Sequence, residues 1–139
     1  MKKINISSKL RNYEVEFIDD IRSHLKKESK DDIFIIDKKV DLKIKLNKKK
    51  IIISPSEIEK NFSNLQKIIQ KLLNLKINRE TKIICIGGGV VQDISSFLSS
   101  IIFRGIDWYF YPTTIISQCD SCIGGKTSIN FKGFKNLIG

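Results

Sequence analysis

Apolar residues along the chain gather in short, nearly continuous runs, which are typical of parallel strands buried on both faces. The runs predict four strands, over residues 33–36, 51–53, 82–86 and 108–111. Two earlier segments, 3–7 and 13–17, alternate polar and apolar positions. They predict a pair of short strands joined by a turn over residues 9–12.

Three segments between these runs place apolar residues three and four positions apart, as an amphipathic helix does. They predict helices over residues 18–28, 56–75 and 90–102. We expect Ser56 to cap the second helix, with Glu57 and Glu59 near the positive end of its dipole. Residues 38–50 are rich in lysine and carry no clear pattern. Strands that alternate with helices indicate an α/β fold with a mostly parallel sheet flanked by helices.

The net charge of the 139-residue chain is +10, which raises the possibility of a polyanionic partner. The excess lies in the first 80 residues, which hold 20 basic and 12 acidic side chains. The chain also has 27 isoleucines, 21 lysines and no alanine, a bias typical of AT-rich codons. We therefore attribute the charge to composition and expect no nucleic-acid partner, because no aromatic-interleaved basic stripe accompanies it.

Hydropathy and cysteine content bear on the compartment. The apolar stretch 83–100 is interrupted by Gln92 and Asp93, so no membrane span is predicted. No apolar run follows the first lysines as it does in a signal peptide, and three cysteines without a secretory signal indicate a reducing compartment. We expect a cytoplasmic protein. The apolar segment 136–139 ends without a cap or a turn, which favours the first part of a longer protein.

A glycine run follows the predicted strand 82–86 directly. Gly87, Gly88 and Gly89 would let phosphates approach the backbone, and the helix that follows would present free N–H groups. The run G-G-G-V-V-Q-D is not the G-x-G-x-x-G fingerprint, so a tight turn without a ligand stays open. Asp93 would either complement the helix dipole or accept a hydrogen bond from a nucleotide.

Three further charged residues are candidates for the site. Asp37 ends a predicted strand, where a ribose-binding carboxylate or a helix cap commonly lies. Glu57 and Lys60 are three positions apart on a predicted helix, and this spacing alone favours a surface salt bridge.

The segment D-S-C-I-G-G-K-T, residues 120–127, is a second cluster of candidate residues. It is not a P-loop, because Asp120 stands where that motif requires glycine. A glycine pair that places Lys126 nevertheless suits a phosphate or a carboxylate, and Lys135 and Asn136 add a cation and an amide.

Cys119 and Cys122 form a C-x-x-C pair inside this region. A closed zinc site needs four ligands, whereas the chain has no second cysteine pair and only one histidine. Structural cysteines are therefore favoured over a redox pair or a metal site.

Taken together, these motifs closely resemble 3-dehydroquinate synthase. The resemblance is collinear from about residue 82 to 139 and weaker over residues 31–75. The motifs that carry it are Gly87-Gly88-Gly89-Val90-Val91-Gln92-Asp93, Phe103-Arg104-Gly105-Ile106, Pro112-Thr113-Thr114 and residues 120–127, with Asn130 and Lys135-Asn136.

The resemblance implies an enzyme that holds NAD and a divalent metal, usually zinc, and converts 3-deoxy-D-arabino-heptulosonate 7-phosphate into 3-dehydroquinate in the shikimate pathway. It implies that residues 1–139 form a Rossmann-like NAD-binding domain that lacks the family's C-terminal helical metal-binding domain. No residue here matches the family's metal ligands. A related sugar phosphate cyclase with another substrate and a catalytically inactive nucleotide-binding fragment remain alternatives.

The same resemblance assigns roles to individual residues. The implied cofactor contacts are Asp37 at the adenosine ribose, Glu57 and Lys60, Gly88 and Gly89 at the pyrophosphate, Asp93 near the nicotinamide, Thr113, Thr114, Lys126 and Lys135. The implied substrate-end residues are Asp120, Lys126 and Asn136, with Arg104 reaching the neighbouring subunit's substrate in a homodimer. Gln92 departs from the family, which has a small residue there, and a larger side chain beside the glycine turn could mark a different sugar phosphate substrate.

Overall fold

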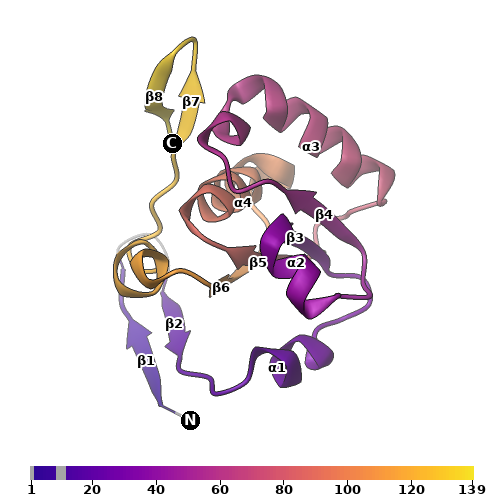
Figure 1. Cartoon of the computed structure of the whole chain (residues 1–139), viewed down its shortest axis with the longest axis vertical. Helices are drawn as coiled ribbons and strands as arrows, with labels where there is room; N and C mark the ends of the chain where they lie inside the picture. Colours follow the sequence, from indigo (N-terminus) through magenta and orange to yellow (C-terminus); the bar gives the residue numbers. More distant parts are fainter. Residues whose placement is uncertain (1, 9–11) are drawn as a thin grey trace.

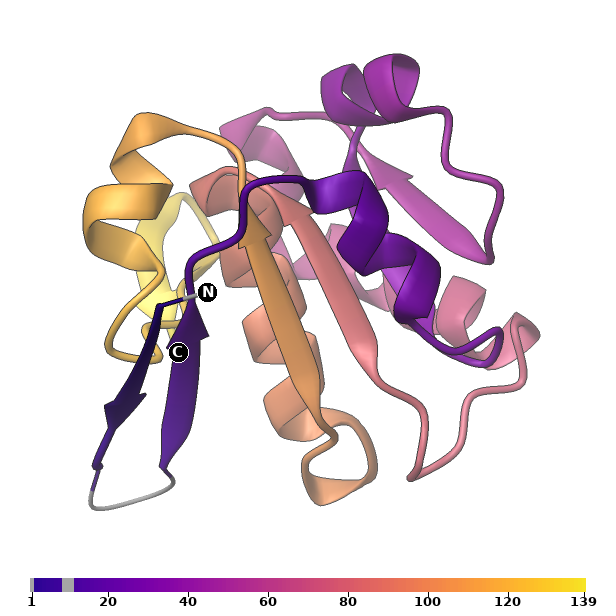
Figure 2. The ribbon, with the colours of Figure 1, turned by 90° about the horizontal axis from the view of Figure 1, so that it is seen from below.

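The computed structural model describes residues 2–8 and 12–139, so most of the predicted turn over residues 9–12 lies outside the described residues. The predicted α/β class is confirmed: a four-stranded parallel sheet has helices on both faces (Figure 1, Figure 2). In chain order the elements are β1 Lys3–Ile6, β2 Tyr13–Glu16, α1 Ile21–Lys27, β3 Ile33–Asp37, α2 Lys38–Ile44, β4 Lys50–Ile53, η1 Glu57–Lys60, α3 Phe62–Asn74, β5 Ile83–Gly87, α4 Gly89–Ile101, η2 Ile102–Arg104, β6 Trp108–Pro112, η3 Ser117–Ser121, β7 Ile129–Phe131 and β8 Phe134–Ile138.

The two central strands, β3 and β5, are buried at every residue. One face of the sheet, with Ile33 and Cys85, packs against α3 and α4. The other face, with Phe34 and Ile84, packs against α1 and α2. Burial on both faces therefore explains the apolar runs of β3 and β5, whereas the runs of the edge strands β4 and β6 include exposed side chains, Ile52 and Tyr109.

The strand order β4-β3-β5-β6 places a reversal of chain direction between β3 and β5. From β3 the chain passes through α2 to β4 on one side, and α3 then carries it back past β3 to β5. Ile36 lies opposite Ile86, so Asp37 and Gly87 end neighbouring strands. Ligands of open α/β sheets bind at such a switch point, beyond the carboxyl ends of the strands.

The single helix predicted over residues 56–75 is wrong at its start. A 3-10 turn, η1, occupies Glu57–Lys60, and α3 begins only after Asn61. Asn61 is extended because it forms a β-bridge with Asn130, and its side chain, rather than that of Ser56, accepts a capping bond from the Ser63 amide at 3.4 Å.

Local caps also set the ends of the first two helices. The helix predicted over residues 18–28 begins at Ile21, because the Asp20 carboxylate accepts hydrogen bonds from the amides of Arg22 and Ser23. The lysine-rich segment that carried no pattern contains α2. No residue of α2 is fully buried, which explains the missing apolar stripe.

Two antiparallel hairpins lie outside the main sheet. The pair β1 and β2 was predicted, whereas β7 and β8, at one end of the molecule in Figure 1, were not. The two-residue turn between β7 and β8, Lys132 and Gly133, has φ angles of 47° and 84°, as a type I′ hairpin turn requires.

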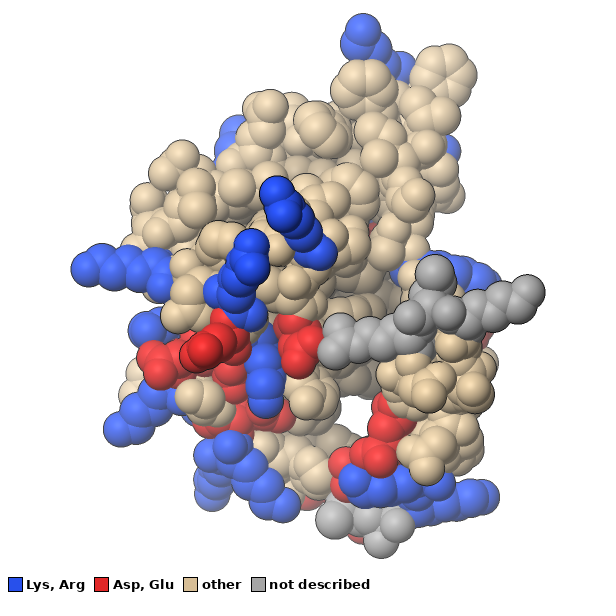
Figure 3. All heavy atoms as spheres, turned by 180° about the vertical axis from the view of Figure 1, so that it is seen from behind, with Lys and Arg blue, Asp and Glu red and all other residues tan. Residues whose placement is uncertain are grey.

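Charged side chains of both signs are interspersed on the face drawn in Figure 3. Over the described ranges, no helix has the length and apolar character needed to cross a membrane.

The turn between β5 and α4 requires glycine at position 87 but not at position 89. A Cβ added to Gly87 would lie 2.8 Å from the Val91 Cβ, whereas nothing lies within 4 Å of one added to Gly89. We predict that Gly87→Ala lowers the free energy of unfolding by about 1–3 kcal/mol through overpacking. Gly89→Ala should leave that free energy within about 1 kcal/mol of wild type, because alanine suits a helix.

Urea denaturation of both variants beside wild type measures this difference. Equal stability of the two variants would contradict the described path of the turn.

Candidate functional site

The N-terminus of α4 is open to a ligand. Its N-cap residue is Gly88, which offers no side-chain cap, and the first hydrogen bond of the helix runs from the Gln92 amide to the Gly88 carbonyl at 3.0 Å. The amides before that bond have no acceptor within the helix. Gly89 is exposed, and the space beside its Cα is empty. Such an end attracts an anionic group such as a phosphate.

The two threonines singled out in the sequence lie beside this turn. The Thr113 amide donates to the Gly87 carbonyl at 2.9 Å. A Cβ on Gly88 would lie 3.0 Å from the Thr114 Cγ2, so the turn and this threonine are in close contact. Both threonines are exposed. The Thr114 hydroxyl also lies 2.8 Å from the Ser117 Oγ, which fixes the start of the next helical segment.

Asp37 lies across the switch point from the glycine turn. Its Oδ1 accepts hydrogen bonds from the amides of Lys39, at 2.7 Å, and Val40, at 3.4 Å. The residue is 6% exposed. The helix-cap interpretation of Asp37 is therefore confirmed, and a ribose contact stays a prediction.

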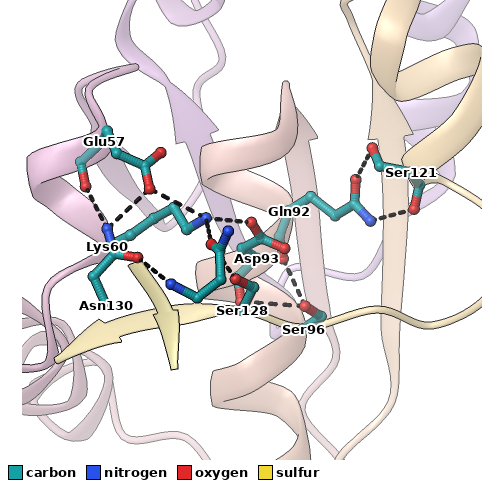
Figure 4. A network of polar contacts seen from close by, with 9 residues as sticks. Glu57, Lys60, Gln92, Asp93, Ser96, Ser121, Ser128 and Asn130 are labelled. Carbon is teal, nitrogen blue, oxygen red and sulfur yellow. Dashed lines mark hydrogen bonds and ion pairs between the residues drawn. The ribbon is translucent and has the colours of Figure 1, made fainter. Parts of the chain in front are cut away.

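A buried lysine joins several of the predicted residues (Figure 4). Lys60 is 5% exposed, and its Nζ lies 2.8 Å from Asp93 Oδ2 and 3.4 Å from Glu57 Oε1. The same Nζ donates to Asn136 Oδ1 at 2.8 Å. The predicted Glu57–Lys60 salt bridge is confirmed, but its expected surface location is wrong for Lys60.

The β7–β8 hairpin supplies a second layer of polar contacts around this lysine. Asn130 Nδ2 donates to Glu57 Oε1 at 2.9 Å, and Asn130 Oδ1 accepts from the Asn136 amide at 2.8 Å. The Ser128 hydroxyl also donates to Asn136 Oδ1. No role was predicted for Ser128 or Asn130. The turn-forming Lys132-Gly133 pair was the one local signal that could have placed them on a hairpin.

The two carboxylates around Lys60 are affected in opposite directions. Burial raises the pKa of Asp93, and the hydrogen bond and charge of Lys60 oppose that shift. The hydrogen bond from Asn130 lowers the pKa of Glu57, helped by the charges of Lys60 and Lys135. Asp93 is the fifth residue of α4, outside its first turn, so one of its two interpretations, the complement to the helix dipole, is wrong.

The predicted substrate-end residues do not all gather here. Lys126 Nζ lies 3.6 Å from Asp120 Oδ1, and both side chains are exposed. Asn136 lies instead against Lys60. Arg104 follows the far end of α4, in a turn where it and Phe103 both have positive φ angles.

The Gln92 backbone adjoins the glycine turn, through the hydrogen bond of its amide to the Gly88 carbonyl, whereas its side chain points elsewhere. Its side chain is buried and points to Ser121, on the side away from Lys60 (Figure 4). The hypothesis that a larger side chain beside the glycine turn marks a different sugar phosphate substrate therefore gains no support from the orientation of Gln92.

The three cysteines are free thiols, with Cys85 buried and Cys119 exposed. The Cys122 thiol donates to the Gln118 carbonyl at 3.2 Å. Within the part of the chain that the structure describes, no three histidine, cysteine or acidic side chains are grouped to hold a metal ion.

Comparison with known proteins agrees with this arrangement. The family described as 3-dehydroquinate synthase N-terminal matches residues 50–139. The 3-dehydroquinate synthase of Campylobacter hominis is 44% identical over 97 residues, which are 69% of this chain and 28% of that protein. The Helicobacter pylori enzyme of the same name is 46% identical over 88 residues, 63% of this chain and 26% of that protein.

Solved structures share the fold. A 2-deoxy-scyllo-inosose synthase complexed with carbaglucose-6-phosphate, NAD+ and Co2+ has a TM-score of 0.81 at 22% identity, covering 99% of this chain and 42% of that one. The 2-epi-5-epi-valiolone synthase of Streptomyces hygroscopicus subsp. jinggangensis, with NAD+ and Zn2+ bound, has a TM-score of 0.69 at 24% identity, covering 78% and 33%.

This chain spans about a quarter of the length of the curated relatives that it matches, 28% and 26% for the two named above. More than half of its residues match the family pattern, which includes the glycine turn, Lys60 and the β7–β8 hairpin. The chain belongs to the 3-dehydroquinate synthase family.

Proposed function

We propose that this chain is the NAD-binding part of a 3-dehydroquinate synthase, which converts 3-deoxy-D-arabino-heptulosonate 7-phosphate into 3-dehydroquinate and phosphate in the shikimate pathway. The overall reaction is a phosphate elimination, so the enzyme would be a carbon–oxygen lyase. The observation that carries the proposal is the open N-terminus of α4 at the switch point of the sheet. Family membership adds the type of reaction.

The residues at this end of α4 fit a dinucleotide. The free amides near Gly89 would bind the pyrophosphate, and the empty space beside that residue would admit it. Thr113 and Thr114 would line the pocket next to the turn. NAD bound there would supply a hydride acceptor, a chemistry that protein side chains lack. Solved cyclases of the same fold hold NAD+, which supports the choice of nucleotide.

Asp37, Glu57 and Lys60 would fix the orientation of the nucleotide. Both described bonds to the Asp37 carboxylate end on Oδ1, and we assign Oδ2 to a ribose hydroxyl. Lys60 is already ion-paired with Glu57 and Asp93, so its role would be to hold these two carboxylates in place beside the cofactor. Asp93 would then face the nicotinamide side.

The substrate carries a phosphate and a carboxylate, and the remaining cations suit both groups. Lys126 is exposed, and among the described residues it is ion-paired with Asp120, which is exposed as well, so Lys126 can turn toward an anion at little cost. The charge of Lys135 helps to lower the pKa of Glu57, so Lys135 lies near that carboxylate and would sit beside cofactor and phosphate. Asn136 would contribute an amide to the substrate end while held by Lys60.

Arg104, the metal and the assembly complete the proposal. Arg104 lies apart from the other residues and would act across a homodimer contact on the neighbouring subunit's substrate. The divalent metal, zinc or another ion, would be held by residues outside this chain, since the described residues offer no such cluster. The reducing environment suggested by the free cysteines is consistent with the cytoplasm.

Other sugar phosphate cyclases share the fold but are less similar in sequence. The solved cyclases are 22–24% identical to this chain, whereas curated 3-dehydroquinate synthases reach 44–46% over the aligned part. We therefore prefer the heptulosonate phosphate over other sugar phosphates as substrate.

The first test measures phosphate release by the natural protein, over its full coding length, with NAD, a divalent metal and either the heptulosonate phosphate or glucose 6-phosphate. We expect NAD-dependent release with the heptulosonate phosphate. Gly89→Ala should weaken NAD binding by about tenfold or more, because its methyl group occupies the space assigned to the pyrophosphate. The matched control is Ser100→Ala, at the opposite end of α4, which should bind NAD like wild type.

Turnover of glucose 6-phosphate alone would favour another cyclase. NAD binding without any turnover would favour an inactive nucleotide-binding protein. Equal NAD affinity of wild type and Gly89→Ala would remove the pyrophosphate from this site.

The second test concerns the charge of Asp93. Lys60→Met leaves this half-buried carboxylate without its cation, so we expect a loss of about 3 kcal/mol in the free energy of unfolding at neutral pH. Burial already raises the pKa of Asp93 above its ordinary 3.8, and removal of Lys60 raises it further. A carboxyl group with a raised pKa destabilises the fold as pH rises through that range, because the unfolded chain ionises first.

The cost of Lys60→Met should therefore be smallest at about pH 4 and largest at about pH 7, as measured by urea denaturation at both values. Lys3→Met removes an exposed ion pair with Glu14 and should show little dependence of this kind. A Lys60→Met cost that is independent of pH would contradict the described pairing.

A further inference from the structure

A buried side-chain amide connects α4 to the segment that carries the predicted substrate-end residues. Gln92 is the fourth residue of α4, at the end of its first turn, and is 2% exposed. Its Nε2 donates to the Ser121 carbonyl, and its Oε1 accepts from the Ser121 hydroxyl at 2.5 Å (Figure 4). Both polar atoms of the Gln92 side-chain amide therefore form hydrogen bonds with one residue, Ser121, which lies 29 positions further along the chain.

Ser121 ends an unusual piece of backbone. Residues Ser117–Ser121 form one π-helical turn, in which the Cys122 amide donates to the Ser117 carbonyl at 3.0 Å. Such turns are rare and are found often at functional sites. Asp120 lies directly before Ser121 in this turn, so a contact that fixes Ser121 also fixes the backbone of Asp120.

The residues after Ser121 have few other anchors. Gly124 and Gly125 have φ angles of 102° and 63°, and residues 123–126 are exposed. The Gly124 amide donates to the Tyr13 hydroxyl at 2.9 Å. The position of Lys126 therefore depends on the glycine-rich backbone that precedes it, which is held at Ser121 and again at Gly124.

We propose that Gln92 is a positioning residue that holds the 117–126 segment against α4, and so places Asp120 and Lys126 at the substrate end of the site. The assignment of those two residues to substrate rests on the proposed function. The contact with Ser121 does not, because it is given by the geometry alone.

The chemistry of the contact requires glutamine. The Ser121 carbonyl needs a donor and the Ser121 hydroxyl needs an acceptor, and a side-chain amide provides both on one planar group. Glutamate would place a second oxygen against the Ser121 carbonyl. Methionine has a similar length but provides no donor. The Gln92 side chain points to Ser121, and both variants keep the backbone amide that donates to the Gly88 carbonyl, so replacement of the side chain should leave nucleotide binding unchanged.

The experiment uses the natural full-length protein and compares wild type with Gln92→Met and Gln92→Glu. Amide hydrogen exchange without ligand is followed in peptides that cover residues 117–126 and in peptides from β3 and β5. We expect exchange in the segment to speed up by about tenfold or more in both variants and to stay unchanged in the two strands. Steady-state kinetics should show a KM for the sugar phosphate raised by about tenfold, with a smaller change in kcat and an NAD Kd within about twofold of wild type.

Two control variants test whether the effects are specific to the contact between Gln92 and Ser121. Ser99→Ala removes another buried hydrogen bond of α4, from the Ser99 hydroxyl to the Ser95 carbonyl, and leaves both bonds between Gln92 and Ser121 in place, so it should change neither exchange nor KM. Ser121→Ala removes one of the two bonds from the other side and should give an intermediate effect. It decides the question if the Gln92 variants fail to fold.

Unchanged exchange over residues 117–126 would overturn the proposal. Faster exchange with an unchanged KM would also overturn it, because the segment would then not serve the substrate. If wild type turns over no sugar phosphate, the proposed function fails, and the exchange measurement still decides whether Gln92 holds the segment.

Discussion

Strands β3 and β5 are buried on both faces, and this constraint organises the rest of the structure. Buried parallel strands need helices on each side, so the chain passes along one face through α2 and along the other through α3 and α4. The crossing from one face to the other creates the switch point between β3 and β5. Asp37 and Gly87 come together there for that reason, and the site assigned to NAD follows from how the core is covered.

Lys60 connects that core to the periphery. A buried ammonium group requires opposite charge and acceptors nearby, and these come from Glu57, Asp93 and Asn136. The three partners belong to η1, α4 and β8, which lie far apart in the sequence. One cation therefore docks the C-terminal hairpin beside the open end of α4, and Gln92 does the same for the π-helical turn from the other side of Asp93.

The elements that sequence alone predicts well are those in which apolar pattern and burial agree. The central strands and α4 are of this kind, and they give the α/β class. The pairing of Glu57 with Lys60 was also predicted, from their spacing of three residues. Elements without an apolar stripe were missed, such as α2, which depends on the Asp37 cap. The start of α3 was misplaced because a long-range bridge between Asn61 and Asn130 extends the backbone there.

The contacts within the site could not be predicted for the same physical reason. Asn136 lies 76 positions after its partner Lys60, and Ser121 lies 29 positions after its partner Gln92. No local sequence pattern encodes contacts over such separations. The resemblance to 3-dehydroquinate synthase named the residues without their contacts. It assigned Lys60 to the nucleotide and Asn136 to the substrate end, and did not indicate that the two side chains are in direct contact.

The most direct test of the central claim is a titration of this chain with NAD, followed by the chemical shifts of its backbone amides. If the dinucleotide binds at the open end of α4, the largest changes will fall on Gly88, Gly89 and Val90, with a second group at Asp37. Changes confined to other surfaces, or none at NAD concentrations that saturate the full-length protein, would contradict a nucleotide site at the switch point of this sheet.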